Sequence, residues 1–280
     1  MRLVPNLQKM GALVLLLAGM PSAHAEQALP WQMGFQPAAS LVREKVDDLH
    51  NELLVIITLI VLFVLGLLVV VIFRFNAKRN PVPSRVAHNT VIEILWTVIP
   101  ILILVVIAIP SFKLLYFEDR TDHAEMTLKV TGHQWYWSYE YPDQGGIGFD
   151  SNLIPDDQSK NRLLDVDNPV VLPVGTNIRI LVQGTDVIHS WFMPAFGVQE
   201  YAVVGRTNES WVNITREGTF YGQCNQICGV NHPFMPIEVK AVSKEDFAKW
   251  LEEAKKKFAQ NGTAAPVTVA ANTPSPAIVK

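Results

Sequence analysis

The chain has 280 residues, of which 49% are apolar and only 18% are charged, so a wholly disordered protein is excluded. The 23 lysines and arginines against 26 aspartates and glutamates give a net charge of −3, which argues against a general nucleic-acid-binding protein. Two cysteines are too few for a scaffold held together by disulfides.

The charges divide the chain into two parts. Residues 1–117 hold 9 basic and 6 acidic residues and contain every long apolar run, whereas residues 118–280 hold 14 basic and 20 acidic residues. This distribution predicts a membrane anchor followed by an acidic globular region.

Residues 1–25 have the pattern of a secretory signal peptide. Arg2 and Lys9 precede the apolar stretch 11–20, and Ala23-His24-Ala25 forms an A-x-A cleavage pattern. The apolar stretch is too short to span a bilayer, although an uncleaved anchor is the alternative.

Two apolar runs predict a transmembrane hairpin within residues 26–117. Residues 53–73 carry no charge and, at about 1.5 Å per residue, cover the ~30 Å hydrocarbon core as a helix. Residues 94–112 form the second run, in which Pro100 and Pro110 are tolerated when neighbouring groups satisfy the freed backbone.

The loop between these runs is basic. Its cations are Arg74, Lys78, Arg79 and Arg85. Because positive loops remain in the cytoplasm, both chain ends are expected on the outer side of the membrane.

Glu93 opens the second apolar run and has two interpretations. A carboxylate near a helix N-terminus is favoured by the helix dipole. An ionisable residue at a membrane segment is also a candidate for proton uptake.

After Phe117 the pattern changes to short alternating segments, which is typical of an antiparallel sandwich or barrel over residues 118–242. The predicted strands are residues 126–131, 134–141, 170–173, 177–183, 187–193, 210–215, 219–222 and 235–242. Residues 243–260 have apolar side chains at helical spacing and predict an amphipathic helix. The Ala/Pro/Thr-rich residues 261–280 predict a disordered tail.

Both cysteines lie in one short stretch that also holds a histidine and a methionine: Cys224, Cys228, His232 and Met235. Thiolate, imidazole and thioether groups are soft ligands that favour copper over magnesium or calcium. Since a blue copper site needs a single cysteine, two cysteines suit two metals bridged by shared sulfurs. His189, in an otherwise apolar strand, is the candidate for the second histidine ligand.

The same cluster also permits a disulfide or a zinc site. A Cys224–Cys228 disulfide suits the oxidising exported side, although such a short loop adds little stability and leaves His232 and Met235 unexplained. Zinc is a third option after copper and the disulfide, but methionine is a poor zinc ligand.

Three motifs together resemble the subunit II family of cytochrome c oxidases in the haem–copper superfamily. They are the cysteine stretch of residues 222–237, the aromatic run GHQWYWSYEY at 132–141, and residues 186–191. The resemblance extends over residues 35–255 and includes the two membrane helices. It implies a cupredoxin-like Greek-key β-barrel after a two-helix anchor.

The resemblance also implies a dinuclear copper centre, CuA. Cys224 and Cys228 would bridge the coppers, His189 and His232 would each ligate one, Met235 would be a weak ligand, and the Gln226 carbonyl would complete the set. Most relatives have glutamate where this chain has Gln226, and the glutamate side chain reaches a magnesium ion at the subunit I interface. An amide binds magnesium less well than a carboxylate, so that second metal is in doubt here.

In this family, electrons pass from cytochrome c through CuA to the haem of subunit I, where O2 is reduced to water with proton pumping. The resemblance identifies Trp135 as the residue where electrons enter and Glu93 as the mouth of a proton-uptake pathway in subunit I. Subunit III is a further expected partner. The chain has no C-x-x-C-H pattern and so no c-type haem site of its own.

Residues 118–242 hold 16 acidic and 8 basic residues, so a basic partner would be steered toward them. The resemblance implies that this partner is cytochrome c, docked on an acidic face. The candidates are Glu140, Asp143, Asp165, Asp167 and Asp186. The leader and the basic loop favour a bacterial inner membrane with the domain in the periplasm.

Three alternative functions account for part of the sequence. A quinol-oxidase subunit would lack the copper ligands, all of which are present. A tethered copper-delivery or storage protein would need no aromatic stripe. A disulfide-stapled receptor domain would bind no metal.

Overall fold

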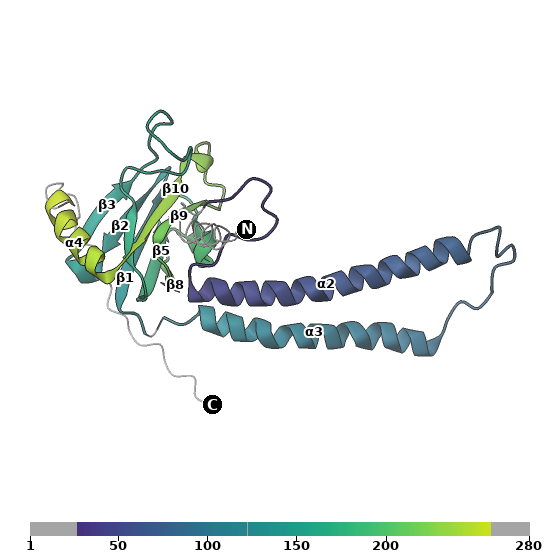
Figure 1. Ribbon diagram of the computed structural model, residues 1–280. Helices are drawn as coiled ribbons and strands as arrows, with labels where there is room; N and C mark the ends of the chain where they lie inside the picture. The colour runs from purple at the N-terminus through teal and green to yellow at the C-terminus, as the bar shows by residue number, and fades with distance from the viewer. Residues whose placement is uncertain (1–26, 122, 259–280) are drawn as a thin grey trace, which may run out of the picture.

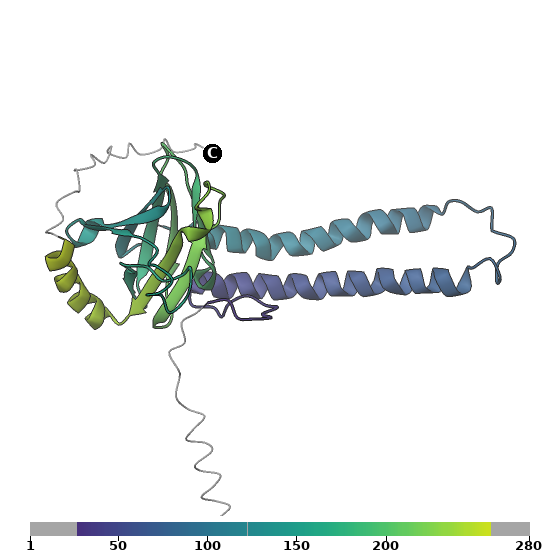
Figure 2. The ribbon, with the colours of Figure 1, turned by 90° about the horizontal axis from the view of Figure 1, so that it is seen from above.

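The computed structural model describes residues 27–121 and 123–258. A hairpin of two long helices projects from an all-β domain (Figures 1 and 2). The predicted signal peptide and the predicted tail lie outside the described residues. The predicted combination of a two-helix anchor and a β domain is therefore confirmed.

The hairpin consists of α2 (Leu41–Arg74) and α3 (Thr90–Glu118), which run antiparallel side by side. Both are long and apolar enough to cross a membrane. With 34 residues, α2 is about 51 Å long at ~1.5 Å per residue, which exceeds the ~30 Å hydrocarbon core. Its first turns therefore extend beyond the uncharged run, toward the β domain. In α3 the helix continues through Pro100 and Pro110.

The first turn of α2 is anchored to the β domain. The Ser40 side chain caps the helix by accepting the N–H of Arg43, and its hydroxyl donates to the carbonyl of Phe196 at 2.6 Å. Gly197 has a φ of +66°, and a β-carbon there would lie 3.1 Å from the Cα of Arg43. Val42 and Arg43 are buried as a result. The helix therefore begins inside the domain's packing.

The β domain is a sandwich of two five-stranded sheets. The first sheet has the order β3 (Ile147–Ser151), β2 (Tyr136–Tyr141), β1 (Met126–His133), β5 (Asn177–Gly184) and β8 (Asn208–Asn213). The second has the order β4 (Val170–Pro173), β10 (Pro236–Val242), β9 (Gly218–Cys224), β6 (His189–Met193) and β7 (Val198–Ala202). Short 3-10 helices occupy η1 (Pro142–Gln144), η2 (Pro194–Phe196) and η3 (His232–Phe234).

The sheets are not purely antiparallel, which corrects the prediction from the sequence. β1 pairs with β5 and β10 pairs with β4 in parallel, because these partners are far apart in the chain and are not joined by hairpins. Strands β3 and β7 were not predicted, because Gly148 and Asp150 in β3 and Glu200 and Ala202 in β7 are residue types that are depleted in strands. In addition, β2 begins at Tyr136, so Trp135 lies in the preceding turn.

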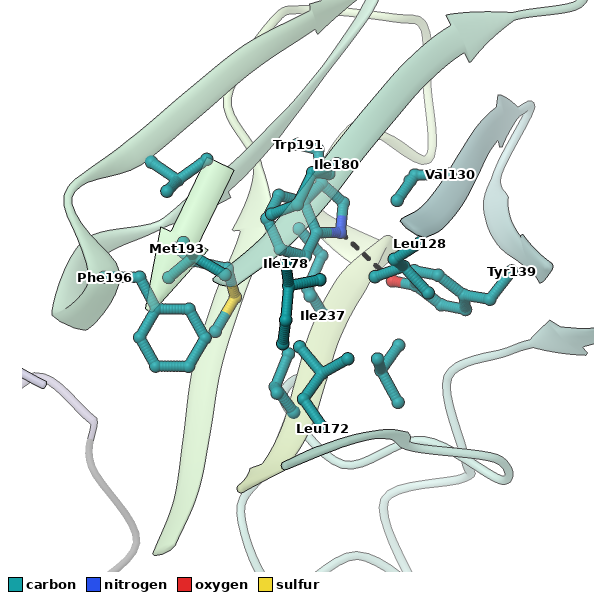
Figure 3. Close-up of a cluster of buried hydrophobic side chains, with 14 of the residues drawn as sticks. Leu128, Val130, Tyr139, Leu172, Ile178, Ile180, Trp191, Met193, Phe196 and Ile237 are labelled. Carbon is teal, nitrogen blue, oxygen red and sulfur yellow. Dashed lines mark hydrogen bonds between the residues drawn. The ribbon is translucent and has the colours of Figure 1, made fainter. Parts of the chain in front are cut away.

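The core fills the space between the sheets (Figure 3). Alternate residues of β1, including Leu128 and Val130, are fully buried, as is Ile180 of β5. Full burial of such a side chain contributes about 1.5–3 kcal/mol. The Trp191 indole N–H donates to the Tyr139 hydroxyl at 3.3 Å, so these two large core side chains keep their polar atoms paired.

Helix α4 (Lys244–Phe258) lies where the sequence predicts an amphipathic helix, with its last predicted residues outside the described ones. It covers β3 and β4, the end strands of the two sheets. The Trp250 ring lies 5.2 Å from the ring of Tyr141, and that of Phe258 lies 4.7 Å from Phe149. Covering these edges protects unpaired strand groups from association with other chains.

Candidate metal centre

The candidate metal centre lies at one end of the second sheet, where β6 and β9 meet the loop of residues 225–235. β6 begins at His189 and β9 ends at Cys224, and the two strands pair with Trp191 opposite Cys224. The ligand atoms of His189, Cys224 and Cys228 all lie within 4.8 Å of one another, and all three residues are buried. Strand pairing therefore brings together a histidine and two cysteines from separate parts of the chain.

The loop after β9 contributes the other predicted ligand residues. The Sγ atoms of Cys224 and Cys228 are 3.9 Å apart, and Nδ1 of His232 lies 3.5 Å from Sγ of Cys228. The backbone carbonyl of Gln226 lies 3.3 Å from Sγ of Cys224. Met235 is buried, and its carbonyl accepts the N–H of Cys224 at 3.1 Å. All six predicted ligand residues thus lie at the same end of the sheet.

The two cysteines are free thiols in the structure. Their sulfur separation of 3.9 Å is far longer than the ~2.05 Å of a disulfide bond. The disulfide that the sequence left open is therefore not formed here, and both sulfurs are available as ligands.

His189 is oriented by a carboxylate. Its Nε2 atom lies 2.8 Å from Oδ1 of Asp186, whereas Nδ1 is buried with no hydrogen-bond partner among the described residues. Burial lowers the pKa of His189, but its interactions with Cys224 and Asp186 outweigh burial and raise that pKa. A carboxylate on one ring nitrogen, with the other nitrogen free, is the usual arrangement around a metal-binding histidine.

The surroundings shift the pKa values of the two thiols in opposite directions. Burial raises the pKa of Cys224, but the neighbouring His189 and the backbone of Ser190 and Gln226 outweigh it and bring the pKa to about 7. Burial, followed by the charge of Cys224, raises the pKa of Cys228 to about 12. A bound cation would allow both thiols to ionise. Together with the unpaired nitrogen of His189, this soft donor set fits copper.

The turn that carries Trp135 directly contacts the loop of residues 225–235. The Gln134 side chain donates to the carbonyl of Cys228 at 2.8 Å. A β-carbon on Gly229 would lie 2.9 Å from Cζ2 of Trp135, so the half-buried indole rests against this glycine. The Gln134 N–H donates to Oδ2 of Asp186 at 2.6 Å. Asp186 therefore links the Trp135 turn to His189.

Sequence reasoning missed these supporting residues. The sequence led only to a docking role for Asp186. Because Asp186 lies three residues before His189, the sequence also offered a signal that its carboxylate could orient that histidine. Sequence reasoning did not single out Gly132, yet a β-carbon there would lie 2.8 Å from Cδ2 of His189. The close approach between these strands becomes evident only in the folded chain.

Glu93 is separated from this centre. It lies in the first turn of α3, at the end of the hairpin opposite the β domain (Figure 1). Its backbone N–H donates to the carbonyl of Asn89 at 3.0 Å, and its carbonyl accepts the hydroxyl of Thr97 at 2.9 Å. Glu93 is half-buried and lies at the basic-loop end of the hairpin.

The acidic residues predicted to form a docking face differ in exposure. Asp143, Asp167 and Asp186 are exposed, and Glu140 is half-buried and paired with Lys129 at 3.2 Å. These four residues have surface available to a partner.

Asp165 is buried, so its assignment to the docking face is wrong. Its Oδ1 accepts the hydroxyl of Tyr221 at 2.8 Å, and its Oδ2 accepts the backbone N–H groups of Lys160 at 2.7 Å and Asn161 at 2.8 Å. The carboxylate organises a loop, because its charge is matched by donors instead of facing water.

We expect Asp165→Asn to destabilise the chain at neutral pH by about 1–3 kcal/mol, because an amide cannot accept from all these donors. Burial raises the pKa of Asp165, but the hydrogen bonds, led by Asn161, outweigh it and lower the pKa below its usual value. The carboxylate therefore stabilises the fold above the unfolded-state pKa, and this contribution disappears as pH falls through the folded-state pKa.

Chemical denaturation of wild type and Asp165→Asn between neutral and acidic pH measures this effect. The stability difference should shrink at the acidic end. Asp157→Asn, an exposed carboxylate in the same loop, is the matched control and should show no such change. A pH-independent difference for Asp165→Asn would contradict the assignment.

Comparison with known proteins agrees with this geometry. The family model described as "Cytochrome C oxidase subunit II, periplasmic domain" matches residues 126–242, and the corresponding "transmembrane domain" model matches residues 28–114. A "Probable cytochrome c oxidase subunit 2" of Rickettsia bellii is 52% identical over 241 residues, covering 85% of this chain and 89% of the relative.

Two further proteins extend the comparison. "Cytochrome c oxidase subunit 2" of Arabidopsis thaliana is 48% identical over 236 residues, covering 81% of this chain and 90% of that protein. A similar solved structure is the crystal structure of the periplasmic domain of subunit II of cytochrome oxidase from Bradyrhizobium japonicum. Its sequence is 50% identical to this one, and the match covers 50% of this chain and 99% of that chain with a TM-score of 0.48. The two family models and the extensive identity to full-length relatives confirm the resemblance found in the sequence, and the chain belongs to the cytochrome c oxidase subunit II family.

Proposed function

We propose that this chain accepts electrons from a cytochrome c at a dinuclear copper centre and passes them to the haem of subunit I. There O2 is reduced to water with proton pumping. The observation that carries the proposal is the cluster of His189, Cys224 and Cys228, whose ligand atoms lie within 4.8 Å of one another. The buried Nδ1 of His189 has no hydrogen-bond partner among the described residues, which supports the proposal because a buried polar atom rarely lacks a partner.

The proposed ligands follow the family pattern. Cys224, Cys228, His189 and His232 would hold the metals, with Met235 and the carbonyl of Gln226 as the further donors. Copper held by this set would supply reversible one-electron oxidation and reduction.

The protein's own part is to hold these donors in place. Cys224 is fixed on β9 by its backbone bond to Met235, and Asn225 donates to the carbonyl of Ser190 on β6 at 3.1 Å. Asp186 holds the imidazole of His189 through Nε2. Donors fixed by a β framework and shielded from water change little in position when the charge changes, which favours fast electron transfer.

Magnesium at the subunit I interface is a weaker part of the proposal. The carbonyl of Gln226 serves copper as well as that of any residue, because it belongs to the backbone. Its amide side chain is a poorer partner for magnesium than a carboxylate. The proposal therefore assigns Gln226 to copper first.

Trp135 is proposed as the residue where electrons enter. Its contact with Gly229, next to Cys228, supports this role because it packs the indole directly against the metal-binding loop.

We expect Trp135→Ala to slow cytochrome c oxidation strongly while copper content stays unchanged. Stopped-flow reduction by cytochrome c measures this rate. Trp250→Ala, on α4, is the matched control and should react at the wild-type rate.

Glu93 is proposed to open a proton-uptake pathway of subunit I. Its place at the basic-loop end of the hairpin, opposite the copper ligands, supports separate routes for protons and electrons.

We expect Glu93→Ala to slow turnover and proton uptake and to leave the copper spectrum unchanged, with Glu93→Asp restoring part of the rate. If the Glu93→Ala oxidase turned over at the wild-type rate, the proposed role of Glu93 in proton uptake would be contradicted.

The family and the two membrane helices make this a membrane-anchored protein. We infer a bacterial inner membrane, with the β domain in the periplasm and the basic loop in the cytoplasm. Subunit I and subunit III are the expected membrane partners. The exposed Asp143, Asp167 and Asp186, with Glu140, are the expected docking face for a basic cytochrome c.

The deciding experiment measures copper content and the visible and EPR spectra of the purified full chain after copper loading. Two coppers per chain with a purple, mixed-valence signal would support the proposal. One copper with a blue-site spectrum, or none, would overturn the dinuclear assignment. The chain would then be closer to a quinol-oxidase subunit or a copper-delivery protein, the two alternatives that share an anchor and an exported domain.

A further inference from the structure

The segment before α2 forms a structured loop, here called the N-terminal hook (residues 29–36). It runs beside the first turns of α2 toward the membrane-spanning part of the hairpin and then returns to the β domain (Figures 1 and 2). The Phe35 ring lies 4.4 Å from the ring of His50, and the guanidinium of Arg43 lies 3.9 Å above Phe35. These contacts fix the hook against α2.

Gln32 closes the tip of the hook. Its backbone N–H donates to the carbonyl of Leu29 at 3.1 Å, and its side-chain oxygen accepts the N–H of Leu29 at 3.0 Å. Its side-chain nitrogen donates to the carbonyl of Phe35 at 2.7 Å. Both ends of the amide are therefore used inside the hook, which makes this a defined turn.

Two large apolar side chains of this turn are fully exposed. Trp31 is 98% exposed and Met33 is 102% exposed. Trp31 also has a φ of +63°, in the left-handed region that a β-carbon disfavours. A strained backbone that presents an indole to the outside is a reason to look for what the indole contacts.

The height of the hook along α2 indicates the contact. His50, which touches Phe35, precedes the uncharged run at Leu53 by three residues, or about 4.5 Å of helix rise. The charged residues of α2 before its final arginine all precede Leu53: Arg43, Glu44, Lys45, Asp47, Asp48 and Glu52. The hook thus lies at the level where the helix passes from a water-exposed to a lipid-exposed surface.

We propose that Trp31 and Met33 insert into the interfacial layer of the lipid bilayer, between headgroups and acyl chains, and act as a third membrane contact beside α2 and α3. Tryptophan is enriched at this layer, where its apolar ring and its N–H are both satisfied. Residues 29–36 carry no charge, and the only polar side chain at the tip, Gln32, is occupied within the turn. Such a surface suits lipid better than a specific protein contact.

A photoreactive residue tests this contact. We would incorporate p-benzoylphenylalanine in place of Trp31 in the assembled oxidase, in nanodiscs of a single phosphatidylcholine, and identify the adducts by mass spectrometry after irradiation. The expected result is a chain-plus-lipid adduct. An adduct to another oxidase subunit would overturn the proposal and make the hook a protein interface. No adduct would also overturn it, since the side chain would then face water.

Two control positions calibrate the experiment. The same probe at Leu59, in the apolar run of α2, should give lipid adducts when the full chain alone is in nanodiscs. The probe at Lys249, on α4 at the far side of the β domain, should give none (Figure 1). Adding Gln32→Ala to the Trp31 probe should reduce the lipid adduct, because the turn loses its brace. An undiminished adduct would show that the turn does not position the side chain.

Discussion

Replacing Cys224 by serine is expected to abolish the dinuclear copper centre. Cys224 is the sulfur that lies close to both Cys228, at 3.9 Å, and the Gln226 carbonyl, at 3.3 Å. Serine has nearly the same shape, but its hydroxyl is a hard donor that stays protonated at neutral pH. The variant therefore keeps the framework and loses the shared soft ligand, so oxidase turnover with cytochrome c should fall to background.

Copper analysis and EPR of the purified Cys224→Ser chain check this result. The expected outcome is at most one copper per chain and no mixed-valence signal. Circular dichroism should show an unchanged β fold, which separates loss of the metal from loss of structure. Met193→Leu, a buried sulfur-to-carbon change on β6 outside the ligand set, is the matched control and should retain both coppers. Two coppers in Cys224→Ser with the wild-type spectrum would refute the assignment.

Asp186→Asn is expected to weaken copper binding about 10–100-fold, the usual effect of removing the carboxylate behind a metal-binding histidine. One carboxylate oxygen faces Nε2 of His189 at 2.8 Å and the N–H of Val187 at 2.6 Å, and the other accepts the N–H of Gln134 at 2.6 Å. An asparagine has a single acceptor oxygen, so its NH2 group must face one of these donors. Either the histidine loses its orientation or the Trp135 turn loses its tether.

Competition with a copper chelator measures the affinity, and the rate of reduction by cytochrome c measures the state of the Trp135 turn. Asp143→Asn is the matched control. It removes the same charge from a carboxylate that also accepts a backbone N–H, that of Thr127 at 2.6 Å, but it does not contact the ligand residues. If both variants bound copper equally well, Asp186 would act only through its charge at the surface.

The cluster of candidate ligands could be predicted from the sequence because most of its residues are close together in the chain. Cys224, Cys228, His232 and Met235 follow one another within twelve residues, so their chemistry is visible before the fold is known. His189 comes from another strand, and only the soft-ligand neighbourhood, together with the resemblance, distinguished it from a core histidine. The hairpin was predictable for a similar reason, since its two apolar runs are continuous.

The remaining features depend on contacts between distant segments. The parallel pairing of β1 with β5 leaves no local signal in the sequence. Strands β3 and β7 contain residue types that are depleted in strands and pair only in the folded sheets. Asp165 and Asp186 look alike in the sequence, yet Asp165 is buried among hydrogen-bond donors and Asp186 contacts the imidazole of His189. Gly132 has a role only because His189 arrives beside it.

Helix α2 is continuous from the β domain, which holds the candidate metal centre, to the run that spans the bilayer. Twelve residues separate its start at Leu41 from Leu53, about 18 Å of rise, and its first turn is fixed against Gly197. One residue inserted there would raise the β domain by about 1.5 Å and also swing it by about 100° around the helix axis. Seven inserted residues would restore the azimuth to within about 20°. The length of this part of α2 therefore sets both the height of the candidate ligand residues above the membrane and the direction in which they face.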